Sequence, residues 1–562
     1  MLAPFRGVRY AQHRISGLAK VTSPPYDVIS PGSMERLLAE DPYNVVRLIL
    51  PGAGVGRARG DTVLPPGGPP EPHGPIPPAA PAWGAAETLR AWLAEGVLAA
   101  DASPALYVYE QAGADGNTGG QIIQRGLIGA VGLSPPGAGI VLPHEDVMPG
   151  PVSGRRQLME ATQANLEPIF LLYEGTAGGI GGSSPQAGTA GGIGGREASP
   201  PQAGTAGGLG PWGSGPWGSG GASREGTAPE GAVSPQAGTA GAAARLVDEV
   251  AATREPLVAV VTDDGETIRH RLWAVTDPDE HAAVAADLAP RRVLIADGHH
   301  RYAAYLELQA RRHAAGDGPG PWDYGLALLV ESTAYPPRLG AIHRVLPGLP
   351  PGRAAELAAA AFSTTPLAFD HRARGAGPSG SGPWGSVARR GGHGGREASS
   401  PLASTTPRGS TCQGGPVPPQ VGMADALCAL AAAGRRGPAF LIAGGGRLWL
   451  LTSPDPAALE AAMPPERSPR WRGLDASILR EFLITRLWGL RDDERDVLVV
   501  HNDPAAALRE ADAADGTAVI CNPLSVGDVT AIAAQGERVP RKSTSFGPKP
   551  RTGLVIRTFA HS

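Results

Sequence analysis

The sequence has few of the features that are typical of secreted proteins, membrane proteins or proteins stabilised by a structural metal ion. Its three cysteines, Cys412, Cys428 and Cys521, are too few and too widely spaced to indicate a disulfide framework or a zinc site. No apolar run approaches the length of a membrane span, and residues 1–25 lack the basic-then-apolar pattern of a signal peptide. We therefore expect a soluble, cytoplasmic protein without a membrane partner.

A strong excess of positive charge is also missing. The formal net charge is −4, and no long block of lysine or arginine stands out. Nucleic-acid binding depends on neutralising phosphates with clusters of such residues. We therefore expect no nucleic-acid partner.

Glycine and proline, in contrast, are abundant. The 80 glycines and 58 prolines make up about a quarter of the 562 residues, and they concentrate in three stretches, 52–82, 175–243 and 371–420. The last two stretches share the phrases "GGREAS" and "SGPWGS". Such segments carry too little apolar surface to offset the entropy of ordering. We interpret them as disordered insertions, and a repeat-based binding segment with exposed tryptophans is the alternative.

The remaining sequence alternates helical and strand patterns. "RRVLIAD" (291–297) has strand character, "GRRQLMEATQANLE" (154–167) predicts a helix, and "AFLIAGGGRLWLLT" (439–452) predicts a hairpin. This alternation predicts an α/β or α+β protein with mixed sheets. The insertions leave three parts, an N-terminal α/β part (1–174), a central part (244–370) and a C-terminal α/β part (421–562).

The central part contains "ADGHHR" (296–301), where a predicted strand ends and a predicted helix begins. Helix N-termini expose unpaired N–H groups and attract anions. Gly298 permits close backbone approach, and Arg301 offers forked donors matched to phosphate or carboxylate. Asp297 is a candidate base, metal ligand or helix cap. The alternative is a capped helix with surface histidines. His299 and His300 point to different sides of a helix, so they are not a chelating pair.

Two other segments place titratable residues after predicted strands or in proline-rich turns. "LPHEDVMPG" (142–150) contributes His144 and Glu145 as catalytic candidates in a loop stiffened by prolines, and a turn of solvated charges is the alternative. "SPPYDVIS" (23–30) contributes Asp27 as an acid, base or cap, and a proline-directed turn is the alternative. If these residues share a site, His144 or Glu145 should lie within about 10 Å of the turn at 297–301.

The fourth segment, "RVPRKSTSFGPKPRTGLVI" (538–556), is basic and rich in hydroxyl groups. A loop of this kind binds anions through side-chain donors, here Lys542, Ser543, Thr544 and Lys549. A basic tail on an acidic body is the alternative. The chain has no Gly-x-x-x-x-Gly-Lys-Ser/Thr loop and no Gly-x-Ser-x-Gly elbow, so P-loop ATPases and α/β-hydrolases are not supported.

In this order, the segments resemble the bacterial family known as domain of unknown function 1015, and the resemblance covers the chain outside the three insertions. Near the end, Val539, Arg541, Ser545 and Gly547 depart from the family's usual run. The positions that still align there are Lys542, Ser543, Thr544, Phe546, Pro548 and Lys549. The matching phrases are "PFRGVRY" (4–10), "PPYDVIS" (24–30), "NVVRLILP" (44–51), "LYVYEQ" (106–111), "LPHEDVMPGPVSGRRQLMEATQANLEPIFLLY" (142–173), "IADGHHRY" (295–302), "IHRVL" (342–346) and "VPRKSTSFGPKPRTGLVI" (539–556).

The stretch "ADGHHRYAAY" (296–305) is also similar to the signature of the ParB/sulfiredoxin superfamily, which includes nucleotide-binding partition proteins, sulfiredoxins and a free-serine kinase. This resemblance implies that Gly298, His299, His300 and Arg301 contact nucleotide phosphates. Sulfiredoxins carry a catalytic cysteine where His299 stands, so their sulfur chemistry is not expected.

Three hypotheses follow for the function. The first is a kinase that uses ATP or ADP with Mg²⁺ on a small-molecule substrate, with positive charge from His299, His300 and Arg301 and with Glu145 or Asp27 accepting the proton of a hydroxyl. The second is a non-catalytic nucleotide sensor whose parts close on binding. The third is a metal-dependent hydrolase that uses His144, Glu145, Asp297 and His299.

Overall fold

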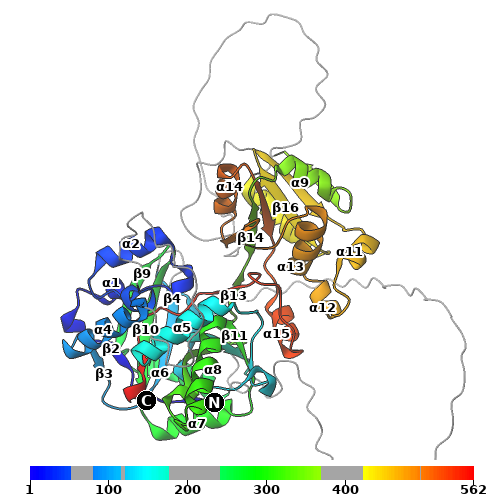
Figure 1. The fold of residues 1–562 in the computed structure, drawn as a ribbon. Coiled ribbons are helices and arrows are strands. Elements are labelled where there is room, and N and C mark those ends of the chain that lie inside the picture. The colour runs from blue at the N-terminus through cyan, green and yellow to red at the C-terminus, as the bar shows by residue number, and fades with distance from the viewer. Residues whose placement is uncertain (52–79, 115–119, 176–240, 369–421, 494, 562) are drawn as a thin grey trace, which may run out of the picture.

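In this computed structural model, residues 1–51, 80–114, 120–175, 241–368, 422–493 and 495–561 are described, and they form two lobes (Figure 1). The disorder predicted for the three insertions concerns residues that lie almost entirely outside these ranges. Helices α4 (Ala80–Ala94) and α6 (Ala242–Thr253) begin just inside two of the predicted insertions, because alanine-rich sequence favours helix.

The larger lobe is built on a nine-stranded mixed sheet with the order β6-β11-β8-β12-β5-β4-β10-β9, to which β1 adds beside β5. The β6–β11 and β8–β12 pairs are parallel, and the others are antiparallel. The predicted mixed α/β class is therefore confirmed. The strands are β1 (Leu2–Ala3), β4 (Leu106–Gly113), β5 (Ile122–Gly132), β6 (Val141–Leu142), β8 (Ile169–Tyr173), β9 (Val258–Asp263), β10 (Thr267–Val275), β11 (Val293–Asp297) and β12 (Tyr324–Glu331).

Helices cover both faces of this sheet. Helices α5 (Pro149–Thr162), α6, α7 (Pro278–Leu288) and α8 (His299–Ala314) supply one core, and α15 (Val526–Ala534) supplies part of the other. Alternate residues of β11 enter the two cores, with Ile295 on one side and Leu294 on the other. Because β11 is covered on both faces, residues 293–296 form a continuous apolar run in the sequence.

The N-terminal segment and the chain end complete the larger lobe. The helix predicted over 154–167 ends earlier, at Thr162, because Gln163 takes a left-handed conformation and Ala164–Asn165 then pairs with Arg557–Thr558. Among the described residues, no helix is long and apolar enough to cross a membrane. The small elements are β2 (Val8–Tyr10), β3 (Leu98–Ala100), β7 (Ala164–Asn165), β21 (Arg557–Thr558), α1 (Leu18–Val21), α2 (Pro31–Glu40) and α3 (Val46–Ile49).

The smaller lobe is an antiparallel sheet with the order β15-β17-β16-β19-β14-β18, and the hairpin predicted at 439–452 forms β16 and β17. The chain leaves the larger lobe after β13 (Arg338–Gly340) and returns to pair β20 (Ser545–Gly547) with β13 (Figure 1). The strands are β14 (Ile342–Leu346), β15 (Ser363–Leu367), β16 (Ala439–Gly444), β17 (Arg447–Thr452), β18 (Leu498–His501) and β19 (Thr517–Cys521). The helices are α9 (Pro351–Ala358), α10 (Met423–Gly434), α11 (Pro456–Ala462), α12 (Pro469–Arg472), α13 (Asp475–Ser477), a π-type helix (Ile478–Leu487) and α14 (Pro504–Ala513).

Candidate functional site

The site forms where two parallel strands end side by side. Val293 of β11 lies opposite Val141 of β6, so the carboxyl ends of both strands meet at one edge of the sheet. His144 follows β6 and His299 follows β11, and the His144 N–H lies 3.3 Å from the His299 Nε2 atom. The predicted closeness of the 142–150 loop to the turn at 297–301 is therefore confirmed.

The turn into α8 depends on Gly298. Its φ of +93° is a left-handed value, and a Cβ at this position would lie 2.8 Å from Ile169 Cγ2. Gly298 is the N-cap residue of α8 and has no side chain to cap it, and within the described part of the chain no side chain accepts from the N–H groups of the first turn. Asp297 does not cap α8, because its carboxylate pairs with Arg301 and Lys549 instead.

A single ammonium group joins two of the predicted catalytic carboxylates. Lys549 Nζ lies 2.5 Å from Asp27 Oδ2 and 2.6 Å from Asp297 Oδ1. Burial alone would raise the pKa of Asp27, but the charges of Lys549 and Arg301 outweigh it and lower the pKa to about 2. Asp27 is therefore ionised at neutral pH, and its side chain is 30% exposed. This carboxylate forms the open side of the cluster.

Glu145 and Lys542 face each other across the same edge. The Lys542 N–H donates to Glu145 Oε1 over 2.5 Å, and Lys542 holds a left-handed φ of +56°. Burial raises the pKa of the Glu145 carboxyl above its usual range, against the opposing effect of Lys542. Within the described part of the chain, the Lys542 ammonium has no carboxylate at ion-pair distance. It is therefore a half-buried positive charge without an acidic partner.

Burial disfavours a positive charge on the three histidines, against the expectation that His299 and His300 supply it. Burial lowers the pKa of His144 to about 3 and the pKa of His299 well below its usual value. Burial also lowers the pKa of half-buried His300, whose Nε2 accepts the Met148 N–H at 3.1 Å. The His144 and His299 rings meet edge to face at 4.4 Å, and His144 Nε2 lies 2.9 Å from Thr544 Oγ1. Near neutral pH these rings offer hydrogen bonds and lone pairs, and the positive charge comes from the lysines.

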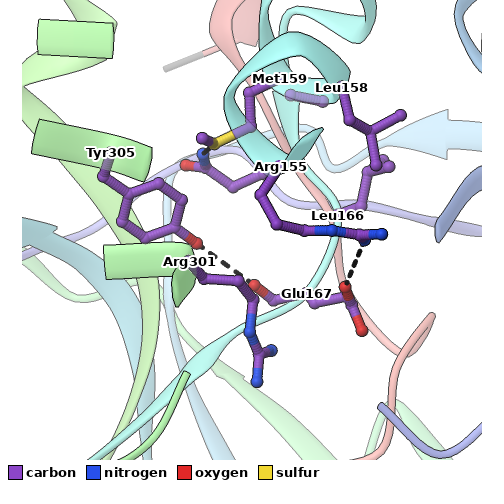
Figure 2. A pocket seen from close by; sticks show the side chains of 9 residues that line it. Arg155, Leu158, Met159, Leu166, Glu167, Arg301 and Tyr305 are labelled. Carbon is purple, nitrogen blue, oxygen red and sulfur yellow. Dashed lines mark hydrogen bonds and ion pairs between the residues drawn. The ribbon is translucent and has the colours of Figure 1, made fainter. Parts of the chain in front are cut away.

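Arg301 lies deeper than its predicted role requires. It is 4% exposed, its Nη1 donates to the Pro168 carbonyl at 2.7 Å, and its Nη2 pairs with Asp297. Behind it is a cavity of about 20 Å³ between α5 and α8 (Figure 2). There the Tyr305 hydroxyl donates to the Glu167 carbonyl at 3.3 Å. The donors of Arg301 are thus used on protein groups, the Asp297 carboxylate and the Pro168 carbonyl.

The hydroxyl groups of Ser543 and Thr544 in the 538–556 loop both contact protein groups. Ser543 is buried and donates to the Pro540 carbonyl at 2.6 Å, so its hydroxyl stabilises the loop itself. Arg344 of β14 donates to the Lys542 carbonyl at 2.9 Å. Sequence reasoning missed Arg344, because its position depends on how the second lobe docks.

Another signal was present in the sequence and was missed. Of the 49 lysine and arginine residues in the chain, only three are lysines, namely Lys20, Lys542 and Lys549. Two of them lie in this site. Lysine and arginine differ in shape, since an ammonium is a compact point charge and a guanidinium is a broad planar fork. In a chain that uses arginine almost throughout, two neighbouring lysines indicate positions that need the smaller group.

The chain belongs to the family described as "Protein of unknown function (DUF1015)", whose model matches residues 2–181 and 237–477. This confirms the expected family. Among curated proteins, no relative was found. A solved structure of a free serine kinase variant in complex with AMP is 9% identical, over 72% of this chain and 84% of that chain, with a TM-score of 0.27. SbnI with a C-terminal truncation, from Staphylococcus aureus, is 10% identical over 77% of this chain and 87% of that chain, with a TM-score of 0.28.

Proposed function

We propose that the chain binds the phosphates of a nucleotide, or of another phosphorylated small molecule, at the first turn of α8. The observation that carries this proposal is the start of α8 beside Lys542: among the described residues, no side chain caps this helix and no carboxylate lies at ion-pair distance from the Lys542 ammonium. Free N–H groups and the positive end of the helix dipole favour an anion at this turn. Lys542 adds a charge-assisted donor beside it. The likeness of 296–305 to a nucleotide-binding signature supports the choice of a nucleotide.

The surrounding carboxylates fit phosphoryl transfer to a hydroxyl group. Phosphoryl transfer needs positioning and charge neutralisation more than covalent chemistry. Glu145 is the better proton acceptor, because a raised pKa makes its carboxylate more basic than that of Asp27. Asp27 contacts Lys549 through Oδ2 and is 30% exposed, so its other carboxylate oxygen is the hard ligand that could help hold a Mg²⁺ ion bound with the phosphates. When bound, Mg²⁺ would neutralise phosphate charge.

A non-catalytic sensor is the second candidate, and one contact favours it. Arg344 belongs to the smaller lobe and holds the backbone of Lys542 in the larger lobe. A ligand that pulls on Lys542 would therefore change a contact between the lobes, which is the coupling that a sensor needs.

Calorimetry with ATP, ADP and inorganic phosphate tests the proposal. The Lys542→Met variant should bind ATP about tenfold to a hundredfold more weakly, because a charge-assisted hydrogen bond contributes about 1.5–3 kcal/mol. Lys20→Met is the matched control, since Lys20 is exposed on α1 and should keep wild-type affinity. Wild-type protein that binds none of the three ligands would contradict the proposal.

A transfer assay separates the two candidates. The wild type is incubated with γ-labelled ATP and a panel of hydroxyl-bearing small molecules. Transfer of label that Glu145→Gln abolishes without loss of ATP binding supports the kinase. Binding without transfer to any acceptor supports the sensor.

A further inference from the structure

The proposed phosphate binding and transfer leave the two buried imidazoles at this edge, those of His144 and His299, without a use. His144, Glu145 and His299 each present one possible ligand atom, and these atoms all lie within 4.8 Å of one another. Ligands about 2.0–2.1 Å from a tetrahedral metal are about 3.4 Å apart, so a closure of about 1–1.5 Å completes the set. The first two residues follow β6 and the third follows β11, so both strand ends hold the cluster in place.

The two imidazoles are both buried at this edge, and their rings meet edge to face with centroids 4.4 Å apart. His144 is fully buried, and its Nδ1 atom has no hydrogen-bond partner in the described residues. A buried polar atom without a partner is costly, and a bound ion is one of the few conditions that explain it.

The hydrogen bonds around the rings indicate which atoms would bind. His144 Nε2 lies 2.9 Å from Thr544 Oγ1, and in the tautomer in which Nε2–H donates to Thr544 the lone pair is on Nδ1, which is then the atom that would bind. The His299 Nε2 lone pair accepts the His144 N–H at 3.3 Å, a long contact that a metal ion can replace. Glu145 uses Oε1 to accept the Lys542 N–H, and its second oxygen remains for a ligand.

Two neighbouring residues are excluded from the set. Asp297 directs one oxygen to Arg301 and the other to Lys549, so it is not the ligand that the hydrolase hypothesis assumed. His300 uses its Nε2 to accept the Met148 N–H on the other side of α8. The remaining donor set is two imidazole nitrogens and one carboxylate oxygen.

We infer that His144, Glu145 and His299 hold a divalent first-row transition-metal ion. Imidazole nitrogens suit zinc, iron and nickel, whereas all-oxygen sets suit magnesium and calcium. Three protein ligands leave at least one coordination position for water or a ligand atom. This ion would lie beside the proposed phosphate site and would be separate from a Mg²⁺ ion that Asp27 helps to hold. The inference does not rest on nucleotide binding.

The test measures metal binding directly. Full-length protein carrying an affinity tag without histidine is stripped with a chelator, loaded with Zn²⁺ or Co²⁺ and freed of excess metal. Metal per chain is then measured by mass spectrometry, and the visible absorption of Co²⁺ reports its coordination. We expect about one ion per wild-type chain and no competition from excess Mg²⁺.

Neighbouring variants serve as matched controls. His299→Gln and Glu145→Gln should weaken Co²⁺ binding at least tenfold, whereas His300→Gln, the adjacent histidine, should keep it. Glu145→Gln retains an acceptor for the Lys542 N–H. It therefore remains the test of metal binding if circular dichroism shows that His299→Gln does not fold. Equal metal content in wild type and Glu145→Gln, or equal loss in His300→Gln, would overturn the inference. ATP binding to metal-free protein is measured separately, so either proposal can fail alone.

Discussion

At the residue scale, the site depends on two ammonium groups with different surroundings. Lys549 is held between Asp27 and Asp297, and burial is outweighed by these two carboxylates, which raise its pKa. Among the described residues, no carboxylate lies at ion-pair distance from the Lys542 ammonium, and the Lys542 backbone N–H donates to Glu145. The first lysine therefore organises the carboxylates, and the second is the one that we propose meets a ligand.

Lys549→Met should destabilise the protein in a pH-dependent way. Two carboxylates would lose their shared cation, at a cost of about 1–3 kcal/mol at pH 7 after allowance for the exposure of Asp27. Lys549 holds the pKa of Asp27 at about 2 against an ordinary 3.8, so the stabilisation exists above the ordinary value and is lost as pH falls through about 2. The free energy of unfolding of wild type and Lys549→Met is measured in urea, and the difference between the two proteins should become smaller below pH 4. A difference that grows on acidification would contradict the assigned pairing.

Residue-level chemistry was partly predictable from sequence. The residue types and the strand-to-helix position of Asp297 and Gly298 were enough to expect their convergence with Glu145. The neutral state of His299 and the inward direction of Arg301 were not predictable. Both depend on burial by α5 and the 538–556 loop, and a sequence motif does not show what will cover it.

At the element scale, the site exists because β6 and β11 run parallel and end together. The strand pattern of 291–297 and the helix after it were predictable from apolar runs and helix-forming residues. The pairing of β6 was not, since Val141–Leu142 is too short to carry a strand pattern. The early end of α5 at Thr162 was also not predictable. It is caused by the pairing of β7 with β21, a strand almost 400 residues away in the sequence.

Gly298→Ala should weaken the turn into α8. A left-handed conformation costs a non-glycine residue about 1–2 kcal/mol, and the added Cβ would also meet Ile169. Gly154→Ala is the matched control, because Gly154 is an exposed glycine inside α5 with open space around it. That control should stabilise the protein by about 0.5–1 kcal/mol. Thermal melting compares the two, and a stabilised Gly298→Ala protein would show that the turn differs from the one described.

At the scale of the whole molecule, the proposed phosphate site lies where the two lobes meet. Arg344 and Asn502 of the smaller lobe hold Lys542 and Ser545, the latter through a hydrogen bond of 3.2 Å. Family membership and the mixed α/β class were predictable from motifs spread along the chain. The return of residues 545–547 to pair with 338–340 was not, because nothing local marks a pairing over such a separation.

Arg344→Met should weaken ATP binding about fivefold to tenfold without removing any group from the phosphate site. The expected cause is a displaced Lys542 loop, worth about 1–1.4 kcal/mol. Arg353→Met is the control, because Arg353 is an exposed arginine on α9 in the same lobe. Calorimetry on folded proteins makes the comparison. Wild-type affinity in Arg344→Met would show that the smaller lobe does not position the site.

The most direct test of the central claim uses the scarcity of lysine. An amine-reactive probe is added to wild-type protein with and without ATP, and labelling of Lys20, Lys542 and Lys549 is quantified by peptide mass spectrometry. If phosphates bind at the first turn of α8, ATP should protect Lys542 strongly and leave exposed Lys20 unchanged, with Lys549 reacting slowly because its pKa is raised. Equal labelling of Lys542 with and without saturating ATP, in protein that binds ATP by calorimetry, would contradict the placement of the nucleotide site.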